Sequence, residues 1–346
     1  MAAAGSNLLV ETLLERYRKL TFDELMRVVG ERQPRRHLYD LVPTYPMRGG
    51  KGLRPGLCIA TCRAFGGETA EALGSAVAIE LFHNAFLVHD DVEDGSEFRR
   101  GLPTMHAEHG VGIAVNVGDA MNVLSIGPLM GNRGVLGPEL AWKIFVEVEH
   151  MVRQSVEGQA LELGWVHDND CNLTTDDYLR MTLKKTCWYT CIHPCRIGGI
   201  IGSRGKANPD IFNRFGYFMG VAFQIQDDIL NLVGDRGKYG KEIGGDILEG
   251  KRTLILIHLL QECALHEKAR LRAFLATPRP DRSERDVAWV YELLAKYGSI
   301  EYARRTARHL AGAALHEFLT AYGPLPESDD KNFVHDIVYY MIERDL

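Results

Sequence analysis

Apolar residues recur three and four positions apart along most of the chain, which is the spacing of one face of an α-helix. About a dozen helices fit this pattern, and no run of alternating β-branched residues indicates a strand. The pattern therefore predicts an all-α fold. The clearest helical segments are residues 8–20, 70–92, 141–166, 211–232 and 287–297.

Glycine, proline and polar residues interrupt this pattern at intervals. Residues 131–138, 202–209 and 277–282 are predicted to be loops, and residues 234–250 form a longer glycine-rich segment. No repeat, low-complexity tract or Pro/Ser-rich linker divides the chain. We therefore expect a single domain over residues 1–346, large enough for a helical bundle around a deep cavity.

Composition narrows the possible functions. The net charge is −6, with 46% apolar and 25% charged residues, which is typical of a soluble globular protein and gives no basis for electrostatic capture of nucleic acid. The N-terminal residues lack a basic start followed by an apolar core, so no secretory signal is expected. The longest apolar stretch, residues 112–129, contains Asp119 and two asparagines, and we expect no membrane span.

The cysteines have a regular spacing. Seven are present, an odd number, which together with the missing signal favours reduced thiols and a cytoplasmic location. Cys187, Cys191 and Cys195 recur every four residues, as do Cys58 and Cys62. This spacing fits either a metal site or a stripe of small buried residues on a helix, and we favour the stripe.

An acidic cluster, Asp90-Asp91-Val92-Glu93-Asp94, ends one strongly apolar helical segment. Asp90 and Asp94 are four residues apart and share a helix face about 6 Å apart along the axis. Unpaired carboxylates at this spacing would repel each other and destabilise the helix end. A hard divalent cation between them removes the conflict, and Mg²⁺ is the natural candidate because it prefers oxygen ligands.

A second cluster, Asp227-Asp228-Ile229-Leu230-Asn231, ends another apolar helix in the same way. Asn231 can coordinate or hydrogen-bond through its carbonyl oxygen but has no charge. One acidic pair is usually a solvated helix face. Two pairs that each close an apolar helix favour a metal-binding function.

Basic residues near these clusters could bind anions. Lys51 and Arg54 lie in a glycine-rich stretch before a predicted helix, a suitable place for an anion site. Arg99-Arg100 follows the first acidic cluster, Lys185-Thr186 lies mid-chain, and two further lysines follow the second cluster, Lys241 and Lys251.

Four blocks of sequence resemble the trans-isoprenyl diphosphate synthase, or polyprenyl synthetase, family. GGKGLRP resembles the family's GGKxxRP, and the run IELFHNAFLVHDDVEDGSEFRRGLPTMH is similar to its first aspartate-rich region. GQALEL and KKT resemble the GQxxD and KT elements. FQIQDDILNLVGDRGKYGKEIGGDILEGKRT is similar to the second aspartate-rich region and its lysine-bearing loop.

The resemblance implies helices around a central cavity, a homodimer, and the condensation of isopentenyl diphosphate with an allylic diphosphate. Asp90, Asp94 and Asp227 would bind Mg²⁺ directly, with Asp91, Asp228 and Asn231 nearby. The residues that would hold isopentenyl diphosphate are Lys51, Arg54, His83 and Arg100. Those for the allylic diphosphate would be Arg99, Lys185, Lys241 and Lys251, with Thr186 and Gln224 close to the reacting centre.

The resemblance also bears on product length, which the family sets largely with the residues four and five before the first aspartate, here Phe86 and Ala85. A small Ala85 would open the groove and Phe86 would narrow it, so we hypothesise geranylgeranyl diphosphate as product, with farnesyl diphosphate or a twenty-five-carbon product as neighbours. Helix geometry independently places His83 and Phe86 on the face of Asp90. Departures from the family pattern are Asn231, Glu162 for Asp in GQxxD, and Gly52.

Two other functions use related features. A class I terpene cyclase also ionises a prenyl diphosphate with acidic clusters and Mg²⁺, but it needs no second diphosphate site, so Lys51, Arg54 and His83 favour condensation. A non-catalytic partner subunit would be expected to lose acidic clusters or diphosphate ligands, yet both clusters are present. The CxxxC pairs of this chain resemble motifs found in some such subunits, so this second alternative stays open.

Overall fold

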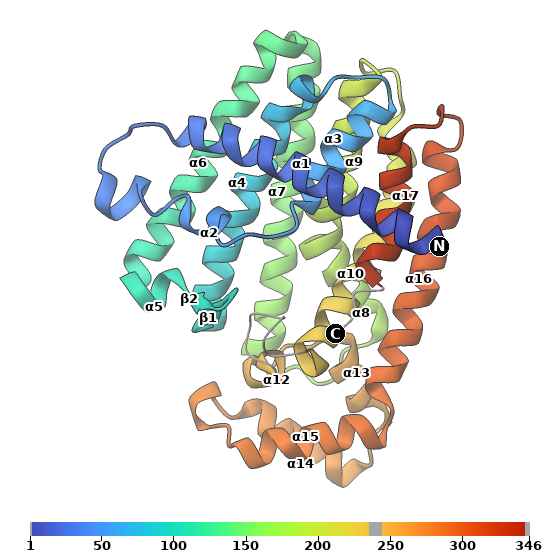
Figure 1. Ribbon diagram of the computed structural model, residues 1–346. Helices are drawn as coiled ribbons and strands as arrows, with labels where there is room; N and C mark the ends of the chain where they lie inside the picture. The colour runs from blue at the N-terminus through green and yellow to red at the C-terminus, as the bar shows by residue number, and fades with distance from the viewer. Residues whose placement is uncertain (1, 235–243, 343–346) are drawn as a thin grey trace.

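The computed structural model describes residues 2–234 and 244–342, with side chains from residue 7 onward (Figure 1). The first part of the chain forms α1 (Ala2–Val29), η1 (Arg35–Tyr39), α2 (Thr44–Met47), α3 (Leu53–Ala64), α4 (Thr69–Asp94), β1 (Phe98–Arg99), β2 (Leu102–Pro103), α5 (Met105–His109), α6 (Val111–Leu136) and α7 (Pro138–His167). The second part forms α8 (Thr175–Thr182), η2 (Leu183–Ile192), α9 (His193–Gly202), η3 (Pro209–Ile211), α10 (Phe212–Val233), α12 (Gly245–Glu249), α13 (Leu254–Glu262), α14 (Leu265–Ala276), η4 (Arg279–Asp281), α15 (Glu284–Lys296), α16 (Ser299–Tyr322) and α17 (Asp329–Ile342).

The all-α prediction is confirmed, and the five predicted segments correspond to α1, α4, α7, α10 and α15. The loop predicted over 131–138 is wrong, because α6 continues to Leu136. The buried Asn132 amide donates to the Ser75 hydroxyl at 2.9 Å and ties these last turns of α6 to α4. Only Gly137, at φ +83°, interrupts the chain before Pro138 begins α7.

A short hairpin that the periodicity did not predict follows α4. β1 and β2 pair antiparallel, Phe98 with Pro103 and Arg99 with Leu102. The turn residues Arg100 and Gly101 both have positive φ, 54° and 75°, as a tight hairpin turn requires. This turn directs Arg100 back toward the glycine-rich stretch before α3, where its guanidinium donates to the Gly49 carbonyl.

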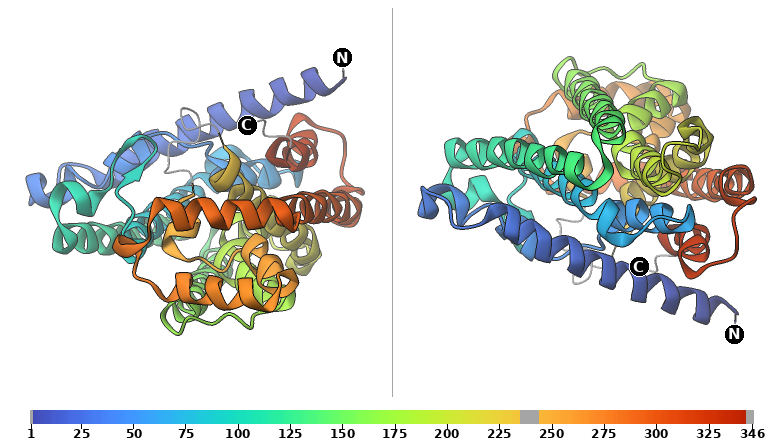
Figure 2. Two further views of the ribbon diagram at one scale, coloured as in Figure 1. Left: turned by 90° about the horizontal axis from the view of Figure 1, so that it is seen from below. Right: turned by 90° about the horizontal axis from the view of Figure 1, so that it is seen from above.

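The long helices lie side by side, α1 crosses one outer face, and α14 and α15 cover one end (Figures 1 and 2). α4 packs against α6 and α3, and α10 packs against α16 and η2. Three buried clusters of apolar side chains hold this arrangement together, and α4 contributes to two of them. The ends of α4 and α10 are thereby fixed in place by burial on several sides, which is the stabilisation a polar site needs.

The cysteines behave as small packing residues. All seven are buried and free, and in the described part of the chain none of them belongs to a group of three side chains placed to hold a metal ion. Cys58 and Cys62 lie on α3 where it packs against α9, and a methyl group at Gly198 would collide with the Cys58 carbonyl oxygen. The helical stripe is therefore favoured over the metal site.

Two helices, α4 and α6, are long and apolar enough to cross a membrane by length and composition. Contrary to the sequence analysis, composition alone therefore does not exclude a span. In α4, 67% of the most apolar window is buried, as in a core helix, whereas in α6 only 39% is buried. The exposed apolar side chains of α6 continue on α7, so the two helices share an exposed apolar face.

Candidate active site

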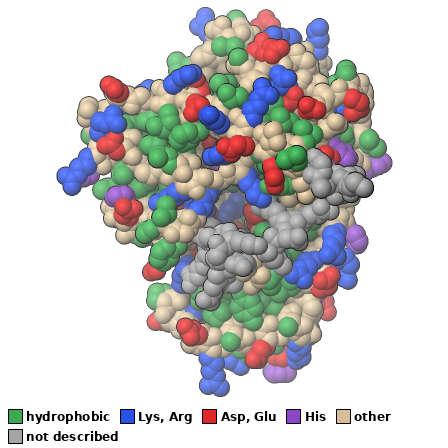
Figure 3. All heavy atoms as spheres, in the orientation of Figure 1, with side chains coloured by type: hydrophobic (Ala, Val, Ile, Leu, Met, Phe, Trp, Pro, Cys, Tyr) green, Lys and Arg blue, Asp and Glu red, His purple; other side chains and the backbone are tan. Residues whose placement is uncertain are grey.

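A cavity of about 690 Å³ opens between α3, α4, η2, α10 and α12. Figure 3 shows it as a hollow in the front face with basic side chains inside. Most of the predicted site residues line it: Lys51, Arg54, His83, Phe86, Asp90, Arg99, Arg100, Lys185, Thr186, Gln224, Asp227, Asp228 and Lys251. Lys241, and with it much of the glycine-rich segment 234–250, lies outside the described residues.

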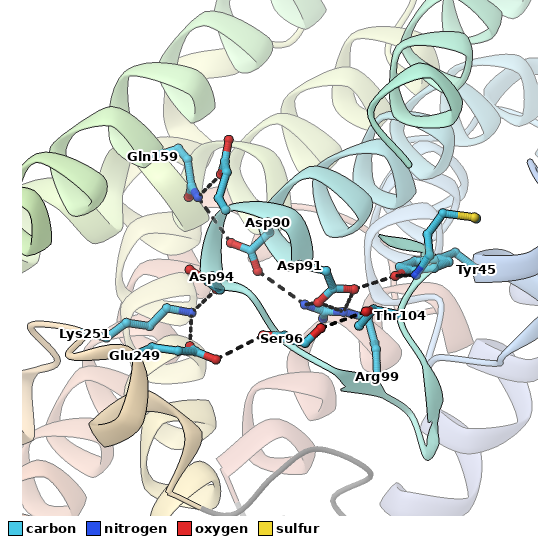
Figure 4. Close-up of polar contacts among 12 residues, drawn as sticks. Tyr45, Asp90, Asp91, Asp94, Ser96, Arg99, Thr104, Gln159, Glu249 and Lys251 are labelled. Atoms are coloured by element: carbon cyan, nitrogen blue, oxygen red, sulfur yellow. Dashed lines mark hydrogen bonds and ion pairs between the residues drawn. The ribbon is translucent and has the colours of Figure 1, made fainter. Parts of the chain in front are cut away.

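Asp90 lies near the end of α4 and gathers cations from two other elements. Its carboxylate is 3.3 Å from Lys185 Nζ and 3.3 Å from Arg99 Nη2. The Gln159 amide of α7 lies 3.4 Å from the same carboxylate. Asp90 therefore joins the α4, α7 and η2 walls of the cavity. Figure 4 shows its contacts with Gln159 and Arg99.

Asp91 has a different position, although it is the next residue. Its side chain is fully buried away from the cavity, where Arg99 donates through Nε at 2.7 Å and lies 2.6 Å away through Nη2. The Tyr45 hydroxyl donates to its other oxygen at 2.6 Å. Asp91 thus fixes Arg99 and the hairpin to α4, and its charge is already balanced by a buried guanidinium.

Asp94, the last residue of α4, pairs with Lys251 at 2.5 Å. Burial raises the pKa of Asp94, and the Lys251 ammonium opposes that rise. Glu249 lies 3.0 Å from Lys251 on the other side (Figure 4). The sequence predicted that the Asp90 and Asp94 carboxylates repel each other. Here each carboxylate pairs with a lysine, Asp90 with Lys185 and Asp94 with Lys251, and these pairs relieve the repulsion.

The second aspartate-rich region lies across the cavity on α10. Asp227 lines the cavity, whereas Asp228 accepts hydrogen bonds from the Tyr178 hydroxyl and the Gln224 amide, both at 2.8 Å. Burial raises the pKa of Asp228. Asn231 is 3% exposed, and its side-chain oxygen accepts from the Asp246 backbone N–H at 3.1 Å.

Lys185 and Thr186 lie in η2, where a π-helical stretch widens the turn. Lys185 forms ion pairs with Glu162 and Asp90, and Thr186 donates to Gln224 at 2.9 Å. Burial would lower the pKa of Lys185, but Glu162 and Asp90 outweigh it and raise the pKa. A side chain at Gly158 of α7 would collide with the Lys185 backbone, which explains a glycine in this block.

The residues predicted to hold isopentenyl diphosphate, here called the basic set (Lys51, Arg54, His83 and Arg100), lie together in the cavity. Arg54 donates to His83 Nε2 at 3.2 Å and to the Thr190 hydroxyl at 2.8 Å. Burial, together with nearby guanidinium groups, lowers the pKa of His83 well below its ordinary value. The neutral ring therefore carries its proton on Nδ1.

Two donors of the basic set are buried without a hydrogen-bond partner in the described structure, His83 Nδ1 and Arg54 Nε. Lys51 lies over the ring of Tyr340 from α17, 4.7 Å from its centroid. Burial and neighbouring arginines outweigh Glu80 and lower the pKa of Arg100. Buried donors and crowded positive charge together fit an anionic ligand.

Phe86 and Ala85 face different surroundings. Phe86 lines the cavity and packs against Phe82 and Tyr189, with ring centroids 5.3 and 5.9 Å away. Ala85 is fully buried in the cluster between α4 and α6 and is not part of the cavity wall. Consecutive side chains on a helix point about 100° apart, so Ala85 does not face the cavity as Phe86 does. The lining of the cavity therefore does not support the expectation that Ala85 opens the groove.

Several residues of the site were missed by the sequence analysis. They are the tyrosines Tyr45, Tyr178 and Tyr189, and the acids Glu80, Asp246 and Glu249. Tyr189 follows Thr186 by about one turn, so its helical spacing could have indicated it. Tyr45 and Asp91 are 46 residues apart and share no local pattern.

Comparison with known proteins gives a consistent result. Residues 35–294 match the family model for polyprenyl synthetase. A geranylgeranyl diphosphate synthase from Saccharolobus solfataricus is 33% identical over 271 residues, which cover 77% of this chain and 79% of that protein. A geranylgeranyl pyrophosphate synthase from Geoglobus acetivorans is 30% identical over 343 residues, or 97% of this chain and 100% of that protein.

The crystal structure of geranylgeranyl pyrophosphate synthetase from Pyrococcus horikoshii superposes with a TM-score of 0.84 at 32% identity. The superposition covers 97% of this chain and 99% of that one. The arrangement of helices is therefore shared along almost the whole length.

Proposed function

This chain belongs to the polyprenyl synthetase family and is a prenyltransferase, and on that premise we propose that it condenses isopentenyl diphosphate with an allylic diphosphate to give geranylgeranyl diphosphate. The observation that carries the proposal is one cavity with two separate sites for anions. Lys185 and Lys251 lie among the acidic helix ends, and the basic set lies on α3 and the loop before it, on α4 and on the hairpin turn. A condensation needs two diphosphates, whereas a cyclase needs one.

We propose Mg²⁺ as the cofactor. Asp90, Asp94 and Asp227 would hold it, since their oxygens suit a hard cation. Asp90 and Asp227 line the cavity, and Asp94 lies one turn after Asp90 at the end of α4. Burial already raises the pKa of Asp94, and a bound cation would reverse that effect. When bound, Mg²⁺ supplies positive charge that stabilises the departing diphosphate.

Other side chains of the cavity bind the two substrates and exclude water. Lys185 and Lys251 bind the allylic diphosphate, so negative charge growing on the leaving group is met by fixed cations. The allylic carbon–oxygen bond breaks, and the double bond of isopentenyl diphosphate, held by the basic set, attacks the cation. This attack forms the new carbon–carbon bond and leaves a positive charge on the isopentenyl unit. The carbon next to that charge loses a proton to the released diphosphate, and a new double bond forms. Phe86 and Tyr189 form an apolar, aromatic wall that keeps water from the cation.

Product analysis tests this function directly. The purified protein, incubated with isopentenyl and farnesyl diphosphates and Mg²⁺, is expected to yield a twenty-carbon diphosphate, and chelating the metal should abolish it. A hydrocarbon formed from the allylic diphosphate alone would indicate a cyclase instead. No turnover by the isolated protein would indicate a non-catalytic partner subunit.

Product length offers a second test of the same cavity. Phe86→Ala removes an aromatic side chain from the wall and should lengthen the product, because the growing chain needs apolar space. Ala85→Phe should shorten it if the groove extends toward α6. Unchanged length with Phe86→Ala would place the floor of the groove elsewhere.

We also propose that the protein is a homodimer in the cytoplasm. α6 and α7 expose a shared apolar face that includes Val123, Met130 and Trp142, the last two 71% and 66% exposed, with the Trp142 ring stacked on Phe145. A second copy of the chain would cover this face, as an isologous interface does. Light scattering should give twice the chain mass, and Trp142→Glu should shift the protein toward monomer.

A further inference from the structure

Glu249, the last residue of α12, joins three parts of the chain at the edge of the active site. One carboxylate oxygen accepts from the Ser96 hydroxyl at 3.0 Å and from Arg279 Nη1 at 2.9 Å. The other oxygen lies 3.0 Å from Lys251 Nζ. Figure 4 shows Glu249 between Ser96, which follows α4, and the lysine.

Arg279 reaches the same place from η4, between α14 and α15. The Nη1 group that contacts Glu249 also donates to the backbone carbonyl of Asp94 at 3.2 Å. Carbonyls at the end of a helix lack helical partners, and a cation there is favourable. One guanidinium nitrogen therefore contacts both the end of the first aspartate helix and the carboxylate beside Lys251.

Lys251 is the cation shared by the two carboxylates of this site, Asp94 and Glu249. Its ammonium lies between Asp94 at 2.5 Å and Glu249 at 3.0 Å, and all three side chains are nearly buried, so solvent screens them little. Two carboxylates compete for one lysine. Arg279 neutralises Glu249 and so limits how far Glu249 draws the ammonium away from Asp94 and from an incoming diphosphate.

The backbone of α12 is held separately. Arg282 donates through Nη1 to the carbonyls of Ile247 and Leu248 at 3.0 and 2.6 Å, and through Nη2 to that of Leu275 at 2.9 Å. α12 should therefore keep its place when Arg279 is replaced. An effect of Arg279 on the site would then pass through the Glu249 and Lys251 side chains.

We propose that Arg279 is a positioning residue for prenyl transfer, which acts through Glu249 on Lys251 and through the Asp94 carbonyl on the end of α4. This inference rests on the proposed function, since it assigns Lys251 to the allylic diphosphate. The expected effect is specific to the allylic diphosphate, because the basic set comes from other elements: α3 and the loop before it, α4 and the hairpin turn. It has no contact with Arg279 among those described above.

The test compares Arg279→Met, Arg279→Lys and Glu249→Gln, with Arg308→Met on the exposed surface of α16 as the control. Arg279→Met should raise KM for the allylic diphosphate about tenfold and KM for isopentenyl diphosphate less than about twofold. Arg279→Lys should restore part of the loss. Adding Glu249→Gln to Arg279→Met should restore part of the loss, because the carboxylate that competes with Asp94 for Lys251 then has no charge.

Equal rises in both KM values, additive effects in the double variant, or lost stability with unchanged kinetics would each overturn the inference. Calorimetric titration of each variant with inorganic diphosphate and Mg²⁺ tests the inference without turnover: Arg279→Met should weaken binding and Arg308→Met should not. A wild-type protein that forms no prenyl product would refute the proposed function, whereas an active wild type with unaffected Arg279 variants would refute this inference alone.

Discussion

The two aspartate-rich regions share a plan in their first two residues. In each, the first aspartate, Asp90 on α4 or Asp227 on α10, lines the cavity. In each, the second aspartate is buried and accepts from a tyrosine hydroxyl, in the pairs Tyr45–Asp91 at 2.6 Å and Tyr178–Asp228 at 2.8 Å. The second aspartate of each pair therefore fixes the helix end, and Asp228 in addition lines the cavity beside Asp227.

The two regions differ in the partner of the second aspartate's carboxylate. Asp91 forms an ion pair with the buried guanidinium of Arg99. Asp228 is joined by the neutral amide of Gln224, and burial raises its pKa. In the first region, Asp91 therefore forms a full ion pair beneath the cavity-facing carboxylate. In the second region, the hydrogen bonds described for Asp228 come from neutral donors.

They differ again at the last position. Asp94 pairs with Lys251, but Asn231 turns its oxygen to the Asp246 backbone and fixes the start of α12. Asparagine is therefore a structural residue here. The second region supplies its charge to the cavity through Asp227 and, from α12, through Asp246, which lines the same cavity.

The largest expected effect tests what the regions share. Asp90→Asn and Asp227→Asn should each lower kcat/KM by about a thousandfold or more, because each removes a carboxylate from the proposed metal site. Steady-state kinetics at saturating Mg²⁺ would measure this. Asp119→Asn on α6, whose side chain is 65% exposed, is a matched control and should be nearly silent. Near-normal activity of Asp227→Asn would mean that only the first region binds metal.

Helical periodicity was sufficient to predict much of this arrangement. It predicted α4 and α10, and the rotation per residue put His83, Phe86 and Asp90 on one face, as the cavity wall shows. The family blocks identified the residues that line the cavity. These signals are local, because each lies within a few turns of one helix.

The partners of the second aspartates could not be predicted in this way. Tyr45 and Tyr178 lie 46 and 50 residues from their carboxylates, and only the packing of distant helices brings them together. The same holds for Arg279, which lies 185 residues from Asp94. The surroundings of Ala85 likewise depend on where α6 packs against α4.

A smaller effect, on stability, tests the difference between the partners of Asp91 and Asp228. Asp91→Asn leaves the buried Arg99 without its main partner and should lower the free energy of unfolding by about 3–5 kcal/mol. Asp228→Asn should cost about 1 kcal/mol or less, because an amide oxygen still accepts from Tyr178. Urea denaturation would measure both. Equal losses would show that the ion pair makes no difference between the regions.

The smallest effect concerns Asn231. Asn231→Asp restores the acidic pattern of the first region, yet kcat should change less than about twofold, because the new carboxylate can still accept from the Asp246 amide and points to α12. Asn231→Leu is the contrasting variant. It leaves that amide without an acceptor and should lower the free energy of unfolding by about 1–3 kcal/mol. Kinetics and urea denaturation would measure the two effects. A large gain in kcat for Asn231→Asp would mean that position 231 reaches the reacting groups, and the contrast between the regions would then reflect a lost metal ligand and not a structural asparagine.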